Sequence, residues 1–326
     1  MVDILQSADI SKTAVVPQEA FAGRWRMRTR VQRVWGVSHA TWFTLMGLGG
    51  GLFILARLLN LSHDLGLWFG LPAVDIVSFV VIAIGGLILL ADLGKPFRFL
   101  RALLNVRTSW ISRGAVADFV FLILGALLVL PNLKIGGAMP FAALPWQSEA
   151  INGAGRTLEV ISILAAVVVT FYAGSVLAAP KSIPYWNSPL VPAQFLLSSA
   201  AMSMGVLSFF FLGVGKGASA GYVALQILFI GLLLVTILWH LMTNKDAPGK
   251  SDSLSILLRG EYKGLFVGGV IVLGTVAPLA LSVAALAVVA GGVREGMLAA
   301  GGCLLIVQGF ILRLLTLRVG IYPPVR

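Results

Sequence analysis

Polar and apolar residues follow one another in long blocks along this chain. Eight blocks are almost wholly apolar, and they lie at about residues 36–58, 68–91, 114–131, 157–179, 190–212, 221–242, 265–290 and 296–318. A helix that rises ~1.5 Å per residue needs about 20 residues to cross a hydrocarbon core ~30 Å thick. Each block reaches or approaches that length, so the pattern predicts an all-α integral membrane protein with eight transmembrane helices. We expect these helices to form two four-helix bundles.

Composition agrees with a membrane protein and gives no sign of a soluble catalytic domain. Hydrophobic residues make up 58% of the 326 residues and charged residues only 11%, which no ordinary soluble core matches. We expect a basic N-terminal arm at 1–35, a membrane domain at 36–320 and a tail at 321–326. The arm has charges and proline where a signal peptide needs an apolar core. Because no segment is long enough to form a soluble catalytic domain, chemistry outside the membrane would require a partner protein.

Basic residues gather on one side of the predicted bundle. An even number of crossings puts both termini at one membrane face, here called face A, with the loops near 92–113, 180–189 and 243–263; the opposite face is face B. Face A then carries 19 of the 24 lysines and arginines. The positive-inside rule predicts that face A is cytoplasmic, in the cytoplasmic (inner) membrane of a bacterium or archaeon. The net charge of +11 thus indicates topology, lipid contact and partner docking rather than nucleic-acid binding.

Several polar side chains share one depth near face A. Charge is costly in hydrocarbon, so each ionisable residue within a span is a functional candidate. A quinone head group needs hydrogen-bond donors at its carbonyls, an apolar channel for its tail and a nearby acid for proton exchange. We interpret His39, Tyr172 and Ser38 as quinone-binding, and Asp92 and Asp118 as catalytic residues for proton exchange.

Each of these assignments has a simpler alternative that the sequence leaves open. Asp92 could neutralise the basic residues that follow it, Tyr172 could be an interfacial aromatic residue, and His39 could bond to a neighbouring helix. Asp75 and Glu159 enter from face B and could form a proton path, or they could be exposed acids at the head groups. The choice depends on which side chains the fold brings together.

Haem and metal centres are poorly supported by the sequence. Cys303 is the single cysteine, and an iron–sulfur cluster needs about four thiolates. His39, His63 and His240 are the three histidines, so a pair of bis-histidine haems is excluded by number, while one haem between His39 and His240 stays an alternative. We expect a quinone, either menaquinone or ubiquinone, with no haem and no metal in this chain.

Three long motifs carry a resemblance to a known family. They read LLADLGKPFRFLRALLNVRTSWISRGA (89–115), YAGSVLAAPKSIPYWNSPLVPAQFLLSSA (172–200) and GGCLLIVQGFILRLLTLRVGIY (301–322). From about 35 to 322, the chain resembles the NrfD / polysulfide-reductase membrane-subunit family, which includes anchors of molybdopterin oxidoreductases. Trp35 and Gly36 stand where family members often have a polar residue.

The resemblance implies an eight-helix subunit without haem that exchanges electrons between the quinone pool and an iron–sulfur subunit. That partner in turn serves a molybdopterin catalytic subunit. The family's site residues, an early histidine in the first helix and a tyrosine in the fourth, match His39 and Tyr172. Asp92 matches the acid of the Asp-Leu-Gly-basic-Pro motif.

The loops of face A are the expected docking surface for the iron–sulfur partner. The basic and aromatic residues of these loops are Lys95, Arg98, Arg101, Arg107, Arg113, Tyr185 and Trp186. Two other functions remain open from the sequence: a secondary transporter or proton-conducting protein, and a pure anchor without a quinone site. Pro278 and the glycines of the first helix are the only hints of the broken helices that transporters use.

Overall fold

The computed structural model describes residues 30–92, 104–144, 146 and 153–323. Three of the expected docking residues, Lys95, Arg98 and Arg101, lie outside the described residues. Eight helices in the described part are long and apolar enough to cross a membrane. The prediction of an all-α integral membrane protein is confirmed.

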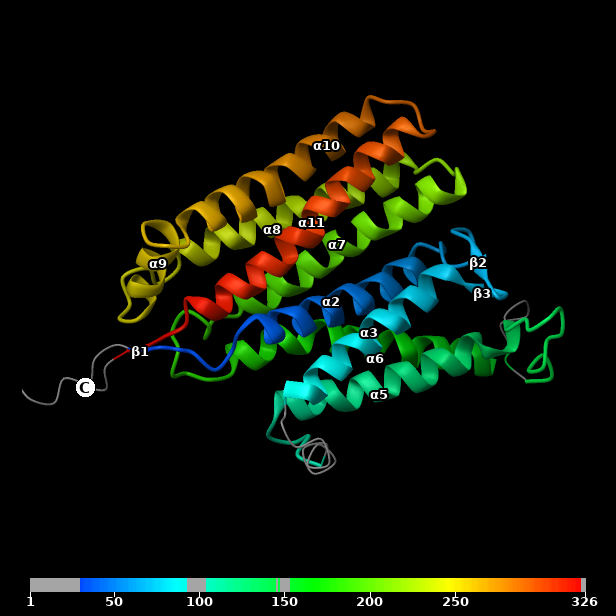
Figure 1. Cartoon of the computed structure of the whole chain (residues 1–326), viewed down its shortest axis with the longest axis horizontal. Coiled ribbons are helices and arrows are strands. Elements are labelled where there is room, and N and C mark those ends of the chain that lie inside the picture. The colour runs from blue at the N-terminus through cyan, green and yellow to red at the C-terminus, as the bar shows by residue number, and fades with distance from the viewer. Residues whose placement is uncertain (1–29, 93–103, 145, 147–152, 324–326) are drawn as a thin grey trace, which may run out of the picture.

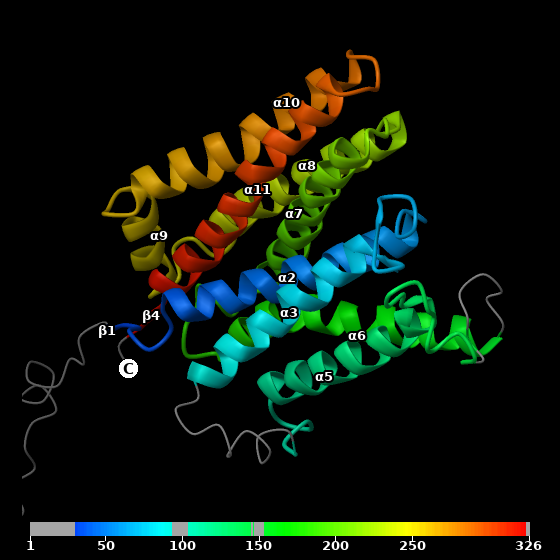
Figure 2. The same ribbon diagram turned by 45° about the vertical axis from the view of Figure 1, so that its right-hand side comes forward.

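The helices form two groups that lie side by side in both views (Figures 1 and 2). The first group consists of α2 (Val37–Leu58), α3 (Ala73–Asp92), α5 (Trp110–Val129) and α6 (Gly153–Ala178). The second consists of α7 (Leu190–Val214), α8 (Ala220–Met242), the π-helix η4 (Gly264–Val276) continued by α10 (Ala277–Leu286), and α11 (Val293–Arg318). Helices α2 and α7 pack against each other and join the two groups.

Glycines let α2 pack closely on three neighbours. Gly51 faces α7, where an added Cβ would lie 2.6 Å from the Ser203 hydroxyl oxygen. Gly49 faces Ile82 of α3, and Gly50 faces α6. Small residues permit such close approach of helix backbones in lipid. The glycine-rich segment of α2 is therefore filled by neighbouring helices and leaves no room for a flat ligand.

The second span begins later than the apolar pattern predicts. A hairpin precedes it, in which β2 (Leu67–Trp68) pairs with β3 (Leu71–Pro72). Phe69 and Gly70 form its two-residue turn with φ of 53° and 80°, as a type I′ turn requires. The side chains of this hairpin are apolar, so the sequence pattern extends the predicted helix back to residue 68 although α3 begins at 73. Asp75 consequently lies in the first turn of α3, whereas a helix that started at 68 would place it about two turns in.

The two ends of the described chain meet at face A. Strand β1 (Arg30–Val31) pairs with β4 (Ile321–Tyr322), which follows α11. The Gln32 side-chain amide donates 2.6 Å to the Leu317 carbonyl and 2.8 Å to the Trp35 carbonyl. The short helix α9 (Lys250–Leu258) lies at the same end of the molecule (Figure 1). The β1–β4 pairing and the two Gln32 hydrogen bonds, together called the terminal clamp, fix the backbone just before α2.

Candidate functional site

His39 and Asp92 meet at face A because α2 and α3 are antiparallel neighbours. His39 lies in the first turn of α2 and Asp92 is the last residue of α3. His39 Nδ1 is 3.6 Å from Asp92 Oδ2 and 3.3 Å from the Ser38 hydroxyl oxygen. Both side chains are partly exposed, His39 by 22% and Asp92 by 24%. This arrangement can hold a proton on the imidazole and pass it to a carboxylate.

Aromatic rings surround His39 on the protein side. The ring centroid of Trp35 is 5.0 Å from that of His39 and 6.1 Å from that of Trp186. Trp42, one turn along α2, is 6.2 Å from His39 and stacks 6.1 Å from Tyr172. Trp42 therefore separates His39 from Tyr172. The two residues belong to neighbouring parts of one site and do not touch.

Tyr172 and Asp118 form the inner part of this site. The fully buried Tyr172 hydroxyl lies beside the Asp118 carboxyl across the contact of α6 with α5. The ring lies against Gly114, one turn before Asp118, in the space that a Cβ at residue 114 would occupy. The Gly-x-x-x-Asp spacing thus seats the tyrosine ring beside its acid.

Two buried hydrogen-bond donors in this region are unused. Within the part of the chain that the structure describes, neither Trp42 Nε1 nor the Tyr172 hydroxyl makes a hydrogen bond of normal geometry, although the hydroxyl lies beside Asp118, whose Oδ1 also lacks one. Trp42 is 1% exposed and Tyr172 is fully buried. A buried donor without an acceptor costs about 1–3 kcal/mol, so such groups call for an explanation. An acceptor ligand between or beside these rings would satisfy both.

An apolar groove between α3 and α5 leads to Asp118. Its volume is about 250 Å³, and it is lined by Ile82, Ala83, Gly86, Leu87, Leu89, Leu90, Ala115, Asp118, Phe119 and Leu122. Asp118 alone is ionisable among these described lining residues. Leu87 and Phe119 are exposed on the bundle surface, where the groove meets lipid. A hydrocarbon tail could therefore enter here from the bilayer.

The expected docking residues have several different environments. Arg113 donates 2.8 Å to the carbonyls of Val106 and Arg107, so it fixes the loop before α5. Tyr185 and Trp186 are buried, 5% and 3% exposed. Burial also raises the pKa of the Tyr185 hydroxyl. Docking contacts in this segment would have to come from its exposed neighbours.

His240 lies apart from the candidate site. Its ring contacts Tyr185, and His240 Nε2 is 3.1 Å from the Tyr185 carbonyl oxygen. A histidine held by a backbone carbonyl is a structural residue rather than a free axial ligand. Among the described residues, no group of three or more His, Cys, Asp or Glu side chains could hold a metal ion.

Arg313 differs from its sequence-based assignment. Arg313 is one of the 19 basic residues that the predicted topology assigns to face A, but it is 0% exposed. It donates 2.7 Å to the Ser199 hydroxyl and 3.1 Å to the Phe195 carbonyl, and no carboxylate in the described part of the chain pairs with it. Arg313 can be buried because Ser198 and Ser199 of the fifth span supply hydrogen-bond acceptors inside the membrane. Arg313 thus lies inside the bundle and not at the basic surface of face A.

Comparisons with known proteins agree on one family. The family described as "Polysulphide reductase, NrfD" matches residues 25–323. The C subunit of the polysulfide reductase of Wolinella succinogenes is 28% identical over 264 residues, which cover 77% of the present chain and 83% of that protein. The Protein NrfD homolog of Haemophilus influenzae is 25% identical over 272 residues, covering 76% and 82%. Protein NrfD of Escherichia coli is 28% identical over 211 residues, covering 60% of each.

Proposed function

Because this chain belongs to the polysulphide reductase NrfD family, we propose that it is the quinone-interacting membrane subunit of a multi-subunit oxidoreductase. The unpaired Trp42 Nε1, together with the neighbouring Tyr172 hydroxyl and its Asp118 carboxyl, carries the quinone assignment. A quinone has two carbonyl oxygens, which accept hydrogen bonds and donate none. The groove beside Asp118 gives its tail an apolar path to the bilayer. These features fit a menaquinone or ubiquinone.

A bound quinone supplies two-electron, two-proton redox chemistry. The residues of this protein bind the head group and hold protons. His39 can exchange a proton with Asp92, which reaches solvent at face A. The Tyr172 hydroxyl can donate to a carbonyl oxygen when the neighbouring Asp118 carboxyl is protonated and donates its own proton to that hydroxyl oxygen. Asp92 and Asp118 thus serve as acids on the two sides of the head group.

The electron partner would dock at face A, beside the His39–Asp92 pair. The similar protein of Wolinella succinogenes is named as one subunit of a reductase, which favours a complex of several subunits. The proposed partners are an iron–sulfur subunit and the molybdopterin catalytic subunit that it serves. Arg107 is an exposed basic residue of this face. The excess of basic residues supports a cytoplasmic face A in the inner membrane of a bacterium or archaeon.

Single substitutions in the assembled complex test this function. We expect His39→Ala and Tyr172→Phe each to reduce quinone-dependent turnover by at least 10-fold and to weaken binding of a quinone analogue. Co-purification of the partner subunits should be unchanged. Tyr222→Phe is the matched control, because this tyrosine is also buried but bonds to Ser208 and Met204 in the second group of helices.

The outcome also separates the alternative functions. Normal turnover and analogue binding in both His39→Ala and Tyr172→Phe would reject the site and favour a pure anchor. Isolation of the native protein alone, with transport activity in vesicles, would favour a transporter. Loss of turnover together with loss of the partner subunits would assign the two residues to assembly instead.

A further inference from the structure

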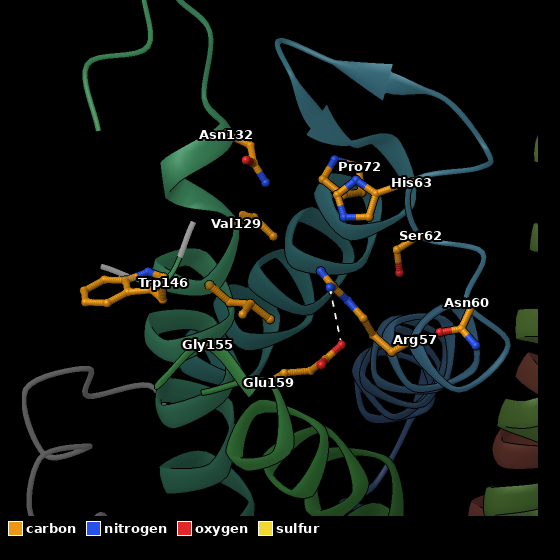
Figure 3. A pocket seen from close by; sticks show the side chains of 11 residues that line it. Arg57, Asn60, Ser62, His63, Pro72, Val129, Asn132, Trp146, Gly155 and Glu159 are labelled. Carbon is orange, nitrogen blue, oxygen red and sulfur yellow. Dashed lines mark ion pairs between the residues drawn. The ribbon is translucent and has the colours of Figure 1, made fainter. Parts of the chain in front are cut away.

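A second ionic cluster lies at the other end of the first group of helices. Arg57 is in the last turn of α2, Asp75 in the first turn of α3 and Glu159 near the start of α6. Arg57 forms an ion pair with Asp75 Oδ2, and its NH1 is 3.6 Å from Glu159 Oε1. Figure 3 shows the pair of Arg57 and Glu159. The proposed quinone site does not use these residues.

The cluster contains one more acid than base. Two carboxyl groups face a single guanidinium group. Asp75 is 0% exposed, and its Oδ1 has no hydrogen-bond partner among the described residues. A buried carboxylate oxygen without a donor is unfavourable, and one guanidinium group cannot neutralise two carboxylates. A proton shared by the Asp75 and Glu159 carboxyl groups makes the cluster with Arg57 electrically neutral. When this proton is on Asp75 Oδ1, that oxygen becomes a hydrogen-bond donor.

A polar cavity connects this cluster to face B. It has a volume of about 210 Å³, and its polar lining comprises Arg57, Asn60, Ser62, His63, Asn132 and Glu159 (Figure 3). One water needs about 10–15 Å³ of such volume, so the cavity has room for several. Exposure decreases inward, from 23% at the Glu159 side chain through 11% at Arg57 to 0% at Asp75. Water can therefore reach Glu159 while Asp75 stays dry.

The polar and charged groups around Asp75 and the cavity come from several neighbouring elements. Helix α2 contributes Arg57 and α6 contributes Glu159. The segment after α2 contributes His63 to the cavity wall, and the turn after α5 contributes the neutral Asn132. Asp64 is directed elsewhere, because its carboxylate pairs with Lys216 at 3.1 Å. The described surroundings thus hold one permanent cation for two acids.

We propose that Arg57, Asp75 and Glu159 form a proton-binding site that loads from face B through this cavity. One proton is shared between the two carboxyl groups, and Arg57 holds both of them in place. Water brings the proton to Glu159, and the proton then passes to Asp75 Oδ1. No bond other than O–H changes and no oxidant or reductant is needed. The site goes beyond the proposed function and does not depend on a quinone.

Infrared spectroscopy of the purified native complex tests the site directly. We expect a protonated-carboxyl stretching band that titrates with bulk pH in the wild type. Glu159→Gln should remove it, because Asp75 and Arg57 then form a balanced ion pair. Asp64→Asn is the control acid of the same face and should leave the band unchanged. A band that is absent from the wild type, or unaffected by Glu159→Gln and Asp75→Asn alike, would overturn the proposal.

Chemical labelling gives a second readout that does not require Asp75 to be replaced. A hydrophobic carbodiimide modifies protonated carboxyl groups, and peptide mass spectrometry identifies the modified residue. We expect Asp75 or Glu159 to be labelled in the wild type, with labelling of Asp75 lost in Glu159→Gln. Wild-type labelling at neither residue would contradict the shared proton, whatever the quinone assays show.

Discussion

The aromatic ring of Tyr172 occupies the place where any residue other than glycine would put its Cβ at position 114. Helices α5 and α6 can therefore approach closely, and the tyrosine hydroxyl is held beside Asp118. A packing feature of one helix thus fixes the position of a donor on another.

Gly114→Ala should damage the site by moving this ring. The added methyl overlaps the ring, so we expect a loss of about 1–3 kcal/mol in stability and a fall in quinone turnover of at least 10-fold. Thermal unfolding in detergent and steady-state rates measure the two effects. Gly231→Ala is the control, because nothing lies within 4 Å of its added Cβ. Normal turnover in Gly114→Ala would mean that the ring position is not needed.

Trp42→Phe should weaken quinone binding, with a loss of stability that comes from packing alone. The indole Nε1 has no acceptor among the described residues, so its removal breaks no known protein hydrogen bond. A lost ligand hydrogen bond of about 0.5–1.5 kcal/mol predicts up to about 10-fold weaker binding. Trp186→Phe should leave quinone binding unchanged and lower stability further, since Trp186 Nε1 donates 2.6 Å to the Thr316 carbonyl and this bond is lost. Analogue titration and thermal unfolding distinguish the two, and equal effects would argue against a donor role for Trp42.

Asp92→Asn and Asp118→Asn should slow proton exchange more than they weaken binding. General acid–base groups contribute typically about 10²–10⁴-fold to rate, so we expect kcat to fall by at least 10-fold with KM nearly unchanged. Asp246→Asn, in the exposed loop after α8, serves as the control. A rise in KM at constant kcat would assign the acids to binding alone.

Arg313→Ala should destabilise the protein strongly. The guanidinium group bonds to α7 through Phe195 and Ser199 and lies against the Phe195 ring. Its removal leaves a cavity and buried acceptors without donors, which together cost about 3–5 kcal/mol. Arg318→Ala, at an exposed position of the same helix, should change stability by about 0.5 kcal/mol or less. Equal unfolding temperatures for the two variants would show that Arg313 is dispensable for packing.

The membrane spans could be predicted well from the sequence because the length of an apolar block is set by the bilayer. That His39 and Asp92 share a face also follows from the sequence, since consecutive helices run in opposite directions. Contacts such as those of Arg57 with Asp75 and Glu159 depend on how each helix is rotated about its axis. An apolar block that is hydrophobic all round hides this rotation. For that reason the pattern does not reveal the environment of Trp42 or Arg313.

The pairing of β1 with β4 sets an order on biosynthesis. Residues 30–31 precede every span and residues 321–322 follow the last one, so the ribosome must finish all eight helices before the terminal clamp can close. Gln32, which positions the Trp35 backbone, finds its acceptor at Leu317 only then. A nascent polypeptide could insert its first four helices correctly while the Trp35 ring beside His39 still lacks this anchor. The backbone before α2 therefore reaches its final position only after the last helix is in place.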